Sequence, residues 1–427
     1  MAILQGAEGK LRRFFDEAAA YARSHAQEIP KRSDDTWRVE RENGDRRLNL
    51  KHGQSPEYLL FLGNNYSDLQ RFASFAQLQD LILSNSKLSA AFIGATGSGD
   101  VMWYAMFRCL LPVLAGLLKA TDAGGQWDAL VTERLKLLDD FLEKDTYTVQ
   151  LYAPLLNFRS EVSDIEIADG IRLREISDSQ LEAYINTIIS FMGQSLVHQL
   201  LTLTFQLELV VELPRLSPYL PPSESGFQAS CRKLLQAFRM IRSGAIDIAF
   251  VGGDSSGPLD LGSTWMVAPR FNVSGDVYEF AVTDVPVIAE LLQKGEILGS
   301  DNRFGLAMRR FMGSYEKPLN GDRLIDYWIA LESLMAPDTS MELVYRLSLR
   351  TTCFIAKARE RKRIFEKVKK SYNARSAFVH GSPKKVDEEI VSFTEECLRK
   401  VLLRCLALGK TPTQTVLDSL VLKDVGP

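Results

Sequence analysis

Two residues near the C-terminus have side chains that could act together on a phosphodiester. Arg375 and His380 are five positions apart, and His380 is one of only four histidines in the chain. An imidazole transfers protons near neutral pH, and a guanidinium binds charged phosphate oxygens through a planar set of N–H donors. This pair therefore predicts acid–base chemistry on a phosphodiester that requires no metal ion and no cofactor.

A helix predicted over 360–380 would carry both residues. Arg375 interrupts a core-facing stripe of that helix, and a charge in such a position must be paired or must face a cleft or a partner. The other members of the stripe are Phe365, Val368, Tyr372 and Val379. Arg375 and His380 are about 140° apart on an ideal helix, so they converge only because arginine is long and the helix ends at His380.

The sequence also predicts where this helix ends. Gly381 is a favourable residue just past a helix, and the Pro383 that follows cannot continue it. His380 would then lie at the negative end of the helix dipole, which favours the protonated imidazole. A protonated His380 would serve as an acid and would attract a phosphate.

Four further residues are candidates for supporting roles. Tyr372 and Ser376 precede His380 by eight and four positions and lie on the same side of the predicted helix. Glu332 and Arg350 interrupt the apolar stripes of helices predicted over 320–335 and 340–358. They could support Arg375, or the three charges could form a buried network that only fixes how the helices pack.

The charge of this region differs from that of the whole chain. Residues 341–410 contain 17 Lys and Arg against 8 Asp and Glu, whereas the chain carries a net charge of −3. Eight of the basic residues fall between Lys357 and Lys370. A solvated helix face accounts for part of this excess, and a surface that follows a phosphate backbone accounts for more.

The rest of the chain divides by pattern into three regions. Residues 1–145 are predicted to be mostly helical, with one hairpin at Asn43-Gly44, and residues 146–298 alternate strands with helices. Residues 299–427 show helical periodicity without a strand signal. The predicted fold class is therefore α+β in the N-terminal and middle regions, followed by an all-α bundle at the C-terminus.

Two glycine-rich segments resemble catalytic motifs without their chemistry. The segment 94–99 has P-loop spacing, but Asp100 stands where the phosphate-binding lysine should be. The segment 253–257 fits G-x-S-x-G, but the proline at 258 prevents the helix that this motif requires. We interpret both segments as loops, and we find no grouping of ligand residues that predicts a metal site.

Composition narrows the class of protein. Apolar residues make up 46% of the chain and charged residues 25%, which is typical of globular domains. Five cysteines without C-x-x-C spacing favour a reducing compartment, and no apolar run is long enough to span a bilayer. We therefore expect a cytoplasmic protein that does not associate with membranes.

Three segments in order resemble the HEPN superfamily, and among its subgroups the Apea-like HEPN domains. These segments are 322–334, 342–350 and 372–381, and the resemblance covers about 300–427. The short R-x4-6-H element at Arg375 and His380 is weak evidence alone, whereas the three blocks together are much more specific. We recognise no family for residues 1–298, which could bind a regulatory ligand or trigger.

The resemblance implies a dimer of helical bundles in which two R-x4-6-H elements share a cleft. Active members are metal-independent endoribonucleases, often in antiviral defence or toxin systems, in which the RNA 2′-hydroxyl attacks its own phosphate. His380 would then be the general base or acid, and Arg375 would stabilise the transition state. Many active members have Asn, Asp or His directly after the arginine, where this chain has Ser376.

Three hypotheses follow from these observations. The first is an RNA endonuclease that acts at Arg375 and His380 of a homodimer. The second is a non-catalytic HEPN module that dimerises or binds RNA in a regulatory protein. The third is an unrelated enzyme whose site lies in the α+β region. An exposed His380 near Arg375, at a two-fold interface, would favour the first, and a His380 ring buried and bonded within its own bundle would oppose it.

Overall fold

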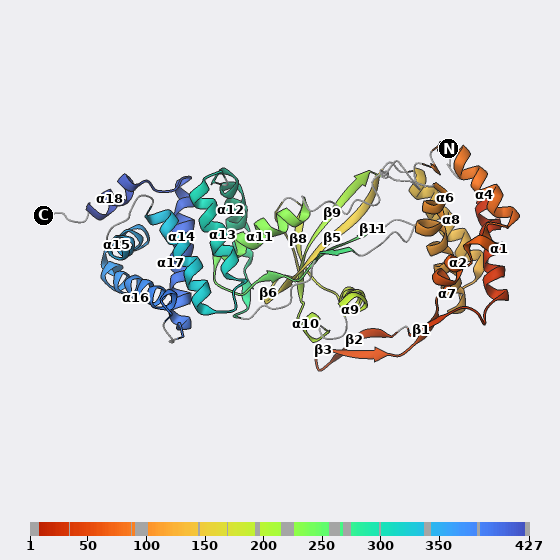
Figure 1. Cartoon of the computed structure of the whole chain (residues 1–427), viewed down its shortest axis with the longest axis horizontal. Coiled ribbons are helices and arrows are strands. Elements are labelled where there is room, and N and C mark those ends of the chain that lie inside the picture. The colour runs from red at the N-terminus through yellow and green to blue at the C-terminus, as the bar shows by residue number, and fades with distance from the viewer. Residues whose placement is uncertain are drawn as a thin grey trace. The chain divides into compact units, whose positions relative to one another are not determined.

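The structure is a computed structural model, and its elements are labelled in Figure 1. It describes residues 8–33, 35–86, 88–89, 101–143, 146–168, 170–192, 197–214, 226–255, 265–267, 275–298, 300–336, 343–381 and 385–422. The chain divides into two compact units. Unit 1 comprises Met1–Leu156, Ser163–Cys231 and Ile248–Asn272, and unit 2 comprises Asn157–Val162, Arg232–Asp247 and Val273–Pro427.

The first part of unit 1 is helical because its segments carry apolar residues at helical spacing. Helix α1 (Glu8–Ser24) buries Leu11, Phe14, Phe15 and Ala18 along one face. It packs against α4, α2 and α7. The other helices here are α2 (Tyr58–Asn64), α3 (Tyr66–Leu69), α4 (Ala73–Ser84), α6 (Val101–Ala105), the π-helical turn Met106–Leu110, α7 (Leu111–Asp122) and α8 (Trp127–Glu143).

The hairpin predicted at Asn43-Gly44 is present. Strands β2 (Thr36–Glu42) and β3 (Asp45–Lys51) pair antiparallel, and φ is 54° at Asn43 and 90° at Gly44. Positive φ at both central residues is what a type I′ turn requires. A second antiparallel pair joins β1 (Lys31–Ser33) to β4 (Gln54–Pro56).

A sheet of long and short strands forms the second part of unit 1. Its strands run in the order β12-β11-β5-β9-β8-β7, and the long pair β5–β9 is in register from Thr146 opposite Pro214 to Leu155 opposite Phe205. Helix α9 (Asp178–Met192) holds the outer edge of β2, because Glu182 and Asn186 accept backbone N–H groups of that strand. The strands are β5 (Thr146–Leu156), β7 (Asp164–Ala168), β8 (Ile171–Glu175), β9 (Phe205–Pro214), β11 (Val251–Ser255) and β12 (Trp265–Val267), with α10 (Val197–Leu200) before β9.

Unit 2 consists mainly of helices around one apolar core. Helix α11 (Phe227–Ile241) begins in unit 1 and continues into unit 2, and the two-residue strand β10 (Asp247–Ile248) lies at the same boundary. A short parallel pair joins β6 (Phe158–Ser160) to β13 (Tyr278–Phe280). The helices that follow are α12 (Val285–Leu298), α13 (Asn302–Ser314), α14 (Asn320–Met335), α15 (Leu343–Ile355), α16 (Arg361–Val379), α17 (Glu388–Leu408) and α18 (Gln414–Leu422).

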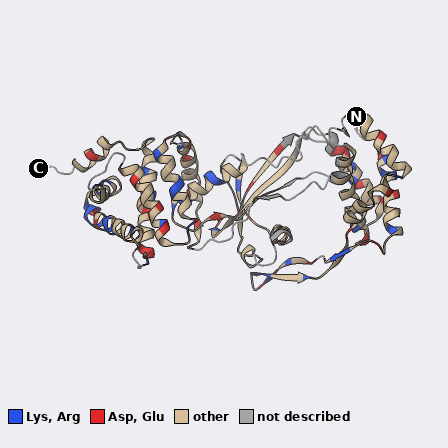
Figure 2. Ribbon diagram, viewed as in Figure 1, with Lys and Arg blue, Asp and Glu red and all other residues tan. Residues whose placement is uncertain are grey.

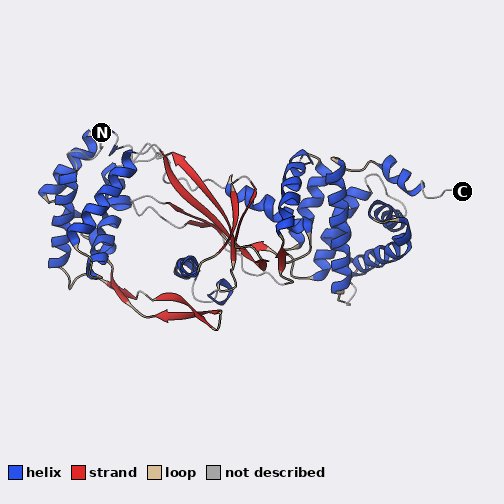
Figure 3. Ribbon diagram, turned by 180° about the vertical axis from the view of Figure 1, so that it is seen from behind, coloured by secondary structure: helices blue, strands red, loops and turns tan. Residues whose placement is uncertain are grey.

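These elements match the predicted pattern. Among the described residues from 300 onward there are helices and no strand, after a part of the chain that contains both, as Figure 3 shows. The core of unit 2 includes Phe311, Tyr327, Trp328 and Phe354, all fully buried. The α+β part followed by a C-terminal helical region is therefore confirmed at this level.

Three sequence expectations concern membranes and the two glycine-rich segments. No helix within the described residues is both long and apolar enough to cross a bilayer. The P-loop-like segment 94–100 lies outside the described residues. The G-x-S-x-G segment was expected to be a loop, which is wrong for 253–255, because these residues pair with β5 as part of strand β11; 256–258 lies outside the described residues.

Candidate functional site

His380 stands at the end of α16 and is exposed to solvent. Its backbone N–H donates to the carbonyl of Ser376 at 3.1 Å, and Gly381 follows with a φ of 79°. The positive φ of Gly381 ends the helix at the position that the sequence predicted. No hydrogen bond or ion pair joins the His380 ring to another described residue, so both ring nitrogens remain available to a substrate.

Arg375 lies one turn earlier and is paired with Glu332 of α14. Its Nη2 atom is 3.7 Å from Glu332 Oε1, and the side chains are 23% and 26% exposed. The Nε of Arg375 and the Oε1 of Glu332 are both buried without a hydrogen-bond partner among the described residues. The contact is thus an ion pair without a hydrogen bond, and the guanidinium keeps unused N–H donors near the surface.

The ionisation of Glu332 reflects its position at the edge of the core. Burial raises the pKa of Glu332, and the positive charge of Arg375 opposes that rise. Each charge therefore reduces the cost of keeping the other away from water. The Glu332 carboxylate holds Arg375 near the surface, and the charge of Arg375 in turn favours the ionised form of Glu332.

Tyr372 packs against the guanidinium of Arg375. Its side chain is buried, whereas His380 is exposed, so the two do not lie on one exposed side of α16. The Tyr372 ring packs edge-on against Trp328 at 4.9 Å between centroids, and the Arg375 guanidinium lies 5.6 Å from its ring centroid. Burial raises the pKa of the Tyr372 hydroxyl, and Glu332 adds to that rise. Ser376 is half-buried and contributes its carbonyl to the last turn.

A chain of hydroxyl groups fixes the middle of α16 in the bundle. The indole N–H of Trp328 donates to Ser371 Oγ at 3.1 Å, and Ser371 bonds the hydroxyl of Thr394 in α17. Thr394 in turn donates to the carbonyl of Ile390. These buried bonds tie α14, α16 and α17 together, so the register of α16 beside Glu332 is set by the core.

Arg350 is buried in a different place from the one expected for a partner of Glu332. Its guanidinium donates to Asp418 Oδ1 of α18 at 2.6 Å and to the carbonyl of Met335 at 3.2 Å. The structure thus shows two separate pairs, Arg375 with Glu332 and Arg350 with Asp418, where the sequence suggested one network of three charges. Arg350 anchors the last helix and does not contact the Arg375 site through these bonds.

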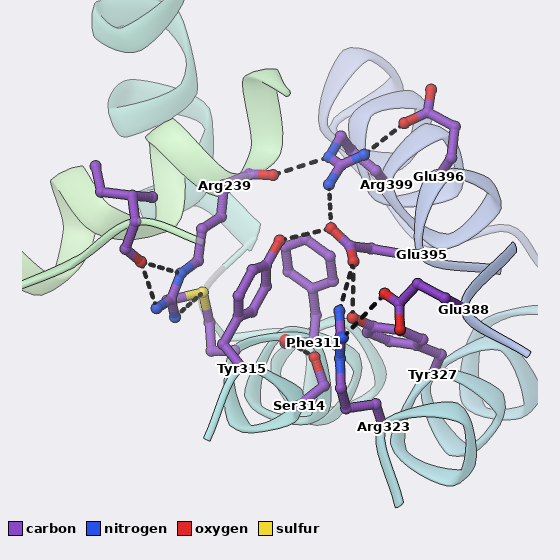
Figure 4. A network of polar contacts seen from close by, with 12 residues as sticks. Arg239, Phe311, Ser314, Tyr315, Arg323, Tyr327, Glu388, Glu395, Glu396 and Arg399 are labelled. Carbon is purple, nitrogen blue, oxygen red and sulfur yellow. Dashed lines mark hydrogen bonds and ion pairs between the residues drawn. The ribbon is translucent and has the colours of Figure 1, made fainter. Parts of the chain in front are cut away.

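A buried polar network of unit 2 centres on Glu395 of α17 (Figure 4). Its carboxylate accepts from Tyr315 at 2.7 Å, from Tyr327 at 2.9 Å and from Arg323 at 3.3 Å, and it also accepts from Arg399. Burial raises the pKa of the Tyr315 hydroxyl well above its ordinary value, and the nearby Glu395 adds to the effect. Four donors on one carboxylate satisfy a charge that would otherwise be very costly to bury.

Arg399 and Arg239 extend this network to α11. The Nε of Arg399 donates to the main-chain carbonyl of Arg239 at 2.9 Å, near the C-terminal end of α11. Arg239 is itself buried, donates to the carbonyl of Ile246 and lies 4.0 Å from the Tyr315 ring centroid. Arg399 therefore satisfies a carbonyl near the end of α11 that the helix itself leaves unpaired.

The sequence reasoning missed this network. The available signal was Glu395 and Arg399, four positions apart, within the apolar periodicity of 386–408. Arg239 carried no such signal, because it lies in a separate part of the sequence, far from its partners along the chain.

The surface of α16 is strongly basic, and Figure 2 shows several Lys and Arg positions along it. Glu366 is the single acidic residue of this helix. The exposed basic residues of α16 are Lys362, Arg363, Lys367, Lys369 and Lys370. The same helix thus carries both a positive surface and the exposed His380 at its end.

Comparisons with known proteins identify no relative of this chain. No protein-family model matches it, and neither a curated protein nor a solved structure matches it. Within the part of the chain that the structure describes, no group of three or more His, Cys, Asp or Glu side chains is arranged to hold a metal ion. The candidate functional site is therefore defined by the residues of α14 and α16.

Proposed function

We propose that the C-terminal bundle is a HEPN-type domain and that the protein is a metal-independent endoribonuclease with Arg375 and His380 in its active site. The observation that carries this proposal is the exposed His380 at the end of α16, with the partly exposed Arg375 one turn earlier. A proton-transfer group and a phosphate-binding group thus lie at one accessible end of one helix. The exposure of His380 supports this proposal over a purely structural role for the histidine.

In the proposed reaction the RNA 2′-hydroxyl attacks the adjacent phosphorus. His380 takes the 2′-hydroxyl proton as a general base, and the bond between phosphorus and the 5′-oxygen breaks. The leaving 5′-oxygen receives a proton from an imidazolium, and the products are a 2′,3′-cyclic phosphate and a 5′-hydroxyl. Arg375 stabilises the extra negative charge on the phosphorus oxygens as the transition state forms.

A homodimer supplies the second imidazole in this proposal. A single imidazole cannot be the base and the acid at the same moment, whereas two copies of His380 in one cleft can divide these roles. The apolar stripe of α16 supports such an interface, because its last residue is exposed to solvent while the earlier ones are buried in the core. Val368 and Tyr372 are buried, but Val379 is 50% exposed beside the site.

A second candidate function is a non-catalytic module that dimerises or binds RNA. The ion pair between Arg375 and Glu332 favours it, because a phosphate would have to compete with the Glu332 carboxylate for the guanidinium. Ser376 also supplies no charge next to Arg375. This candidate predicts RNA binding and self-association that His380→Ala leaves unchanged, without any cleavage.

The deciding experiment is a cleavage assay on bulk RNA and on tRNA in the presence of EDTA. We expect the wild-type chain to produce 2′,3′-cyclic phosphate ends, and Arg375→Ala and His380→Ala each to lose roughly 10²-fold or more in rate. Arg309→Ala, which removes an exposed arginine of α13, is the matched control and should cleave normally. The proposal fails if both site variants cleave like the wild type while retaining its unfolding transition.

A further inference from the structure

One side of α16 presents a continuous polar stripe that ends at the proposed catalytic histidine. Lys362, Lys369, Asn373 and His380 are separated by seven, four and seven positions, so they lie within about 20° of one line along the helix. All four are exposed. The stripe is about 27 Å long from Lys362 to His380.

The two lysines of this stripe are free to bind an external anion. Neither Lys362 nor Lys369 forms an ion pair with another described residue, whereas Lys367, about 140° around the helix from Lys362, pairs with Glu389 at 3.4 Å. A lysine without an internal partner gives up no protein contact when it binds a phosphate. These two lysines therefore offer more net binding free energy to a polyanion than Lys367 does.

An exposed aromatic ring stands beside the start of the stripe. Tyr345 of α15 is 54% exposed, and its ring packs edge-on against Phe365 at 5.7 Å between centroids. Phe365 lies on α16 between Lys362 and Lys369 in sequence and within about 60° of both around the helix. The Tyr345 ring is thus held in place by Phe365, and its side chain stays more than half exposed.

We infer that single-stranded RNA binds along this stripe, with phosphates on Lys362 and Lys369 and one base stacked on Tyr345. This inference rests on the proposed function, since it gives the RNA a path that leads to His380. Surfaces that bind single strands combine a basic track with aromatic rings on which bases stack. A duplex keeps its bases paired and offers Tyr345 no base to stack on, so the surface selects unpaired RNA.

The length of the stripe limits the RNA that it can hold. At the roughly 3.4 Å spacing of a stacked strand, 27 Å corresponds to about eight nucleotides, and an extended strand would place fewer. Tyr345 would therefore hold a base several nucleotides away from the phosphate at His380. Under this inference, residues of α15 and α16 determine at which nucleotide of an unpaired segment the RNA is cleaved.

Binding can be measured without cleavage. The probe is a fluorescein-labelled 2′-O-methyl oligouridine of about twelve nucleotides, whose blocked 2′-oxygen cannot attack the phosphate. Fluorescence anisotropy of the full chain in EDTA, over a range of salt concentrations, gives both the affinity and its salt dependence. The variants are Lys362→Ala/Lys369→Ala, Tyr345→Ala and Tyr345→Phe, with Lys317→Ala/Lys410→Ala as the control for two exposed lysines of unit 2.

We expect the double variant at 362 and 369 to reduce the slope of log affinity against log salt by about 1.4, the value for two phosphate contacts on a single strand. Tyr345→Ala should weaken binding roughly 5- to 100-fold without changing that slope, because stacking is lost and no charge is removed. Tyr345→Phe should bind like the wild type. The same Tyr345→Ala change should leave binding to a 2′-O-methyl duplex unaltered.

Three results would overturn the inference: a wild-type chain that does not bind the probe, a Tyr345→Ala variant that binds it normally, or an equal slope change in the control pair. Thermal unfolding of each variant separates loss of binding from loss of fold. If the protein binds the probe in the expected way but never cleaves RNA, the proposed nuclease function is wrong and the inferred RNA-binding surface still stands.

Discussion

The guanidinium of Arg375 is held 3.7 Å from the carboxylate of Glu332 at the edge of the C-terminal core. Each residue has one buried polar atom without a hydrogen-bond partner among the described residues. The pair is therefore held by charge attraction and not by a fixed hydrogen bond. Such a contact keeps an arginine in place while leaving its N–H donors for another ligand.

The first prediction concerns the stability of this pair. Arg375→Ala leaves Glu332 half-buried without its counter-charge, and we expect the free energy of unfolding at neutral pH to fall by about 1–2 kcal/mol. Burial already raises the pKa of Glu332, and loss of Arg375 raises that pKa further. The folded state then holds a proton that the unfolded state releases, so stability decreases as the pH rises above the ordinary Glu range near about 4.3.

Urea unfolding of wild type and Arg375→Ala between mildly acidic and neutral pH tests this dependence. The difference between the two should be smallest at the acidic end, because there the protonated Glu332 of the folded variant needs no counter-charge. Adding Glu332→Gln to Arg375→Ala should restore most of the lost stability, yet the double variant should remain inactive. A loss of equal size at every pH, or no rescue by Glu332→Gln, would contradict this account.

The second prediction concerns the buried carboxylate of Glu395. Glu395→Gln removes a charge that four donors surround, and it leaves the Arg399 guanidinium without its buried partner. We expect a loss of roughly 2–4 kcal/mol in the free energy of unfolding. Glu396→Gln is the matched control on the same helix, because Glu396 also binds Arg399 but is 47% exposed, and it should cost at most about 1 kcal/mol.

Urea unfolding followed by circular dichroism distinguishes these two variants. A Glu395→Gln protein as stable as Glu396→Gln would show that the network contributes little to the stability of unit 2. The network does not touch His380 through any described bond. The glutamine variant should therefore retain RNA cleavage at temperatures where it is folded.

The third prediction concerns the close packing of α14 against the end of α16. A Cβ added at Gly321 would lie 2.3 Å from Cε2 of Phe378, two residues before His380. Gly321→Ala should therefore lower the free energy of unfolding by roughly 1–3 kcal/mol, although alanine normally favours a helix. Gly313→Ala is the control, since an added Cβ there meets nothing within 4 Å, and it should stabilise α13 by about 0.5–1 kcal/mol.

The cause of the Gly321 effect can be isolated with a double-mutant cycle. In a Phe378→Ala background the ring is absent, so Gly321→Ala should cost nothing or should stabilise the protein. Thermal unfolding of the four proteins gives the coupling between the two positions. Independent effects of the two substitutions would show that the contact with Phe378 is not the reason for the glycine.

The fourth prediction concerns the glycine that ends α16. Gly381 has a φ of 79°, and an alanine there costs about 1 kcal/mol in the left-handed region. Gly381→Ala should loosen the last turn and lower the rate of RNA cleavage, because the backbone of His380 is then less firmly held at the helix end. Gly409→Ala imposes the same strain after α17, where φ is 64°, and should lower stability to a similar degree without lowering the rate.

A comparison of the two glycine variants uses the cleavage assay beside thermal unfolding. Equal losses of activity in both would assign the effect of Gly381 to general stability. A loss confined to Gly381→Ala would show that the helix end positions His380.

Local patterns in the sequence determined the helices of the C-terminal region and the ends of α16. The prediction of 320–335 coincides with α14, and the predicted end at His380 coincides with the C-cap of α16. Helical periodicity, the Asn43-Gly44 turn and the Gly381 stop act within a few residues, so they can be read without knowledge of the packing. The exposure of His380, in contrast, was left open by the sequence and was decided by the structure.

Only the tertiary structure decided which charges meet. Glu332, Arg350 and Arg375 looked alike in the sequence, but the packing of α14, α15, α16 and α18 gave Arg375 to Glu332 and Arg350 to Asp418. Arg239 reaches Arg399 although 160 positions separate them. Pairing between distant charges depends on how whole helices pack together. The spacing of residues within one helix does not show which other helices pack against it.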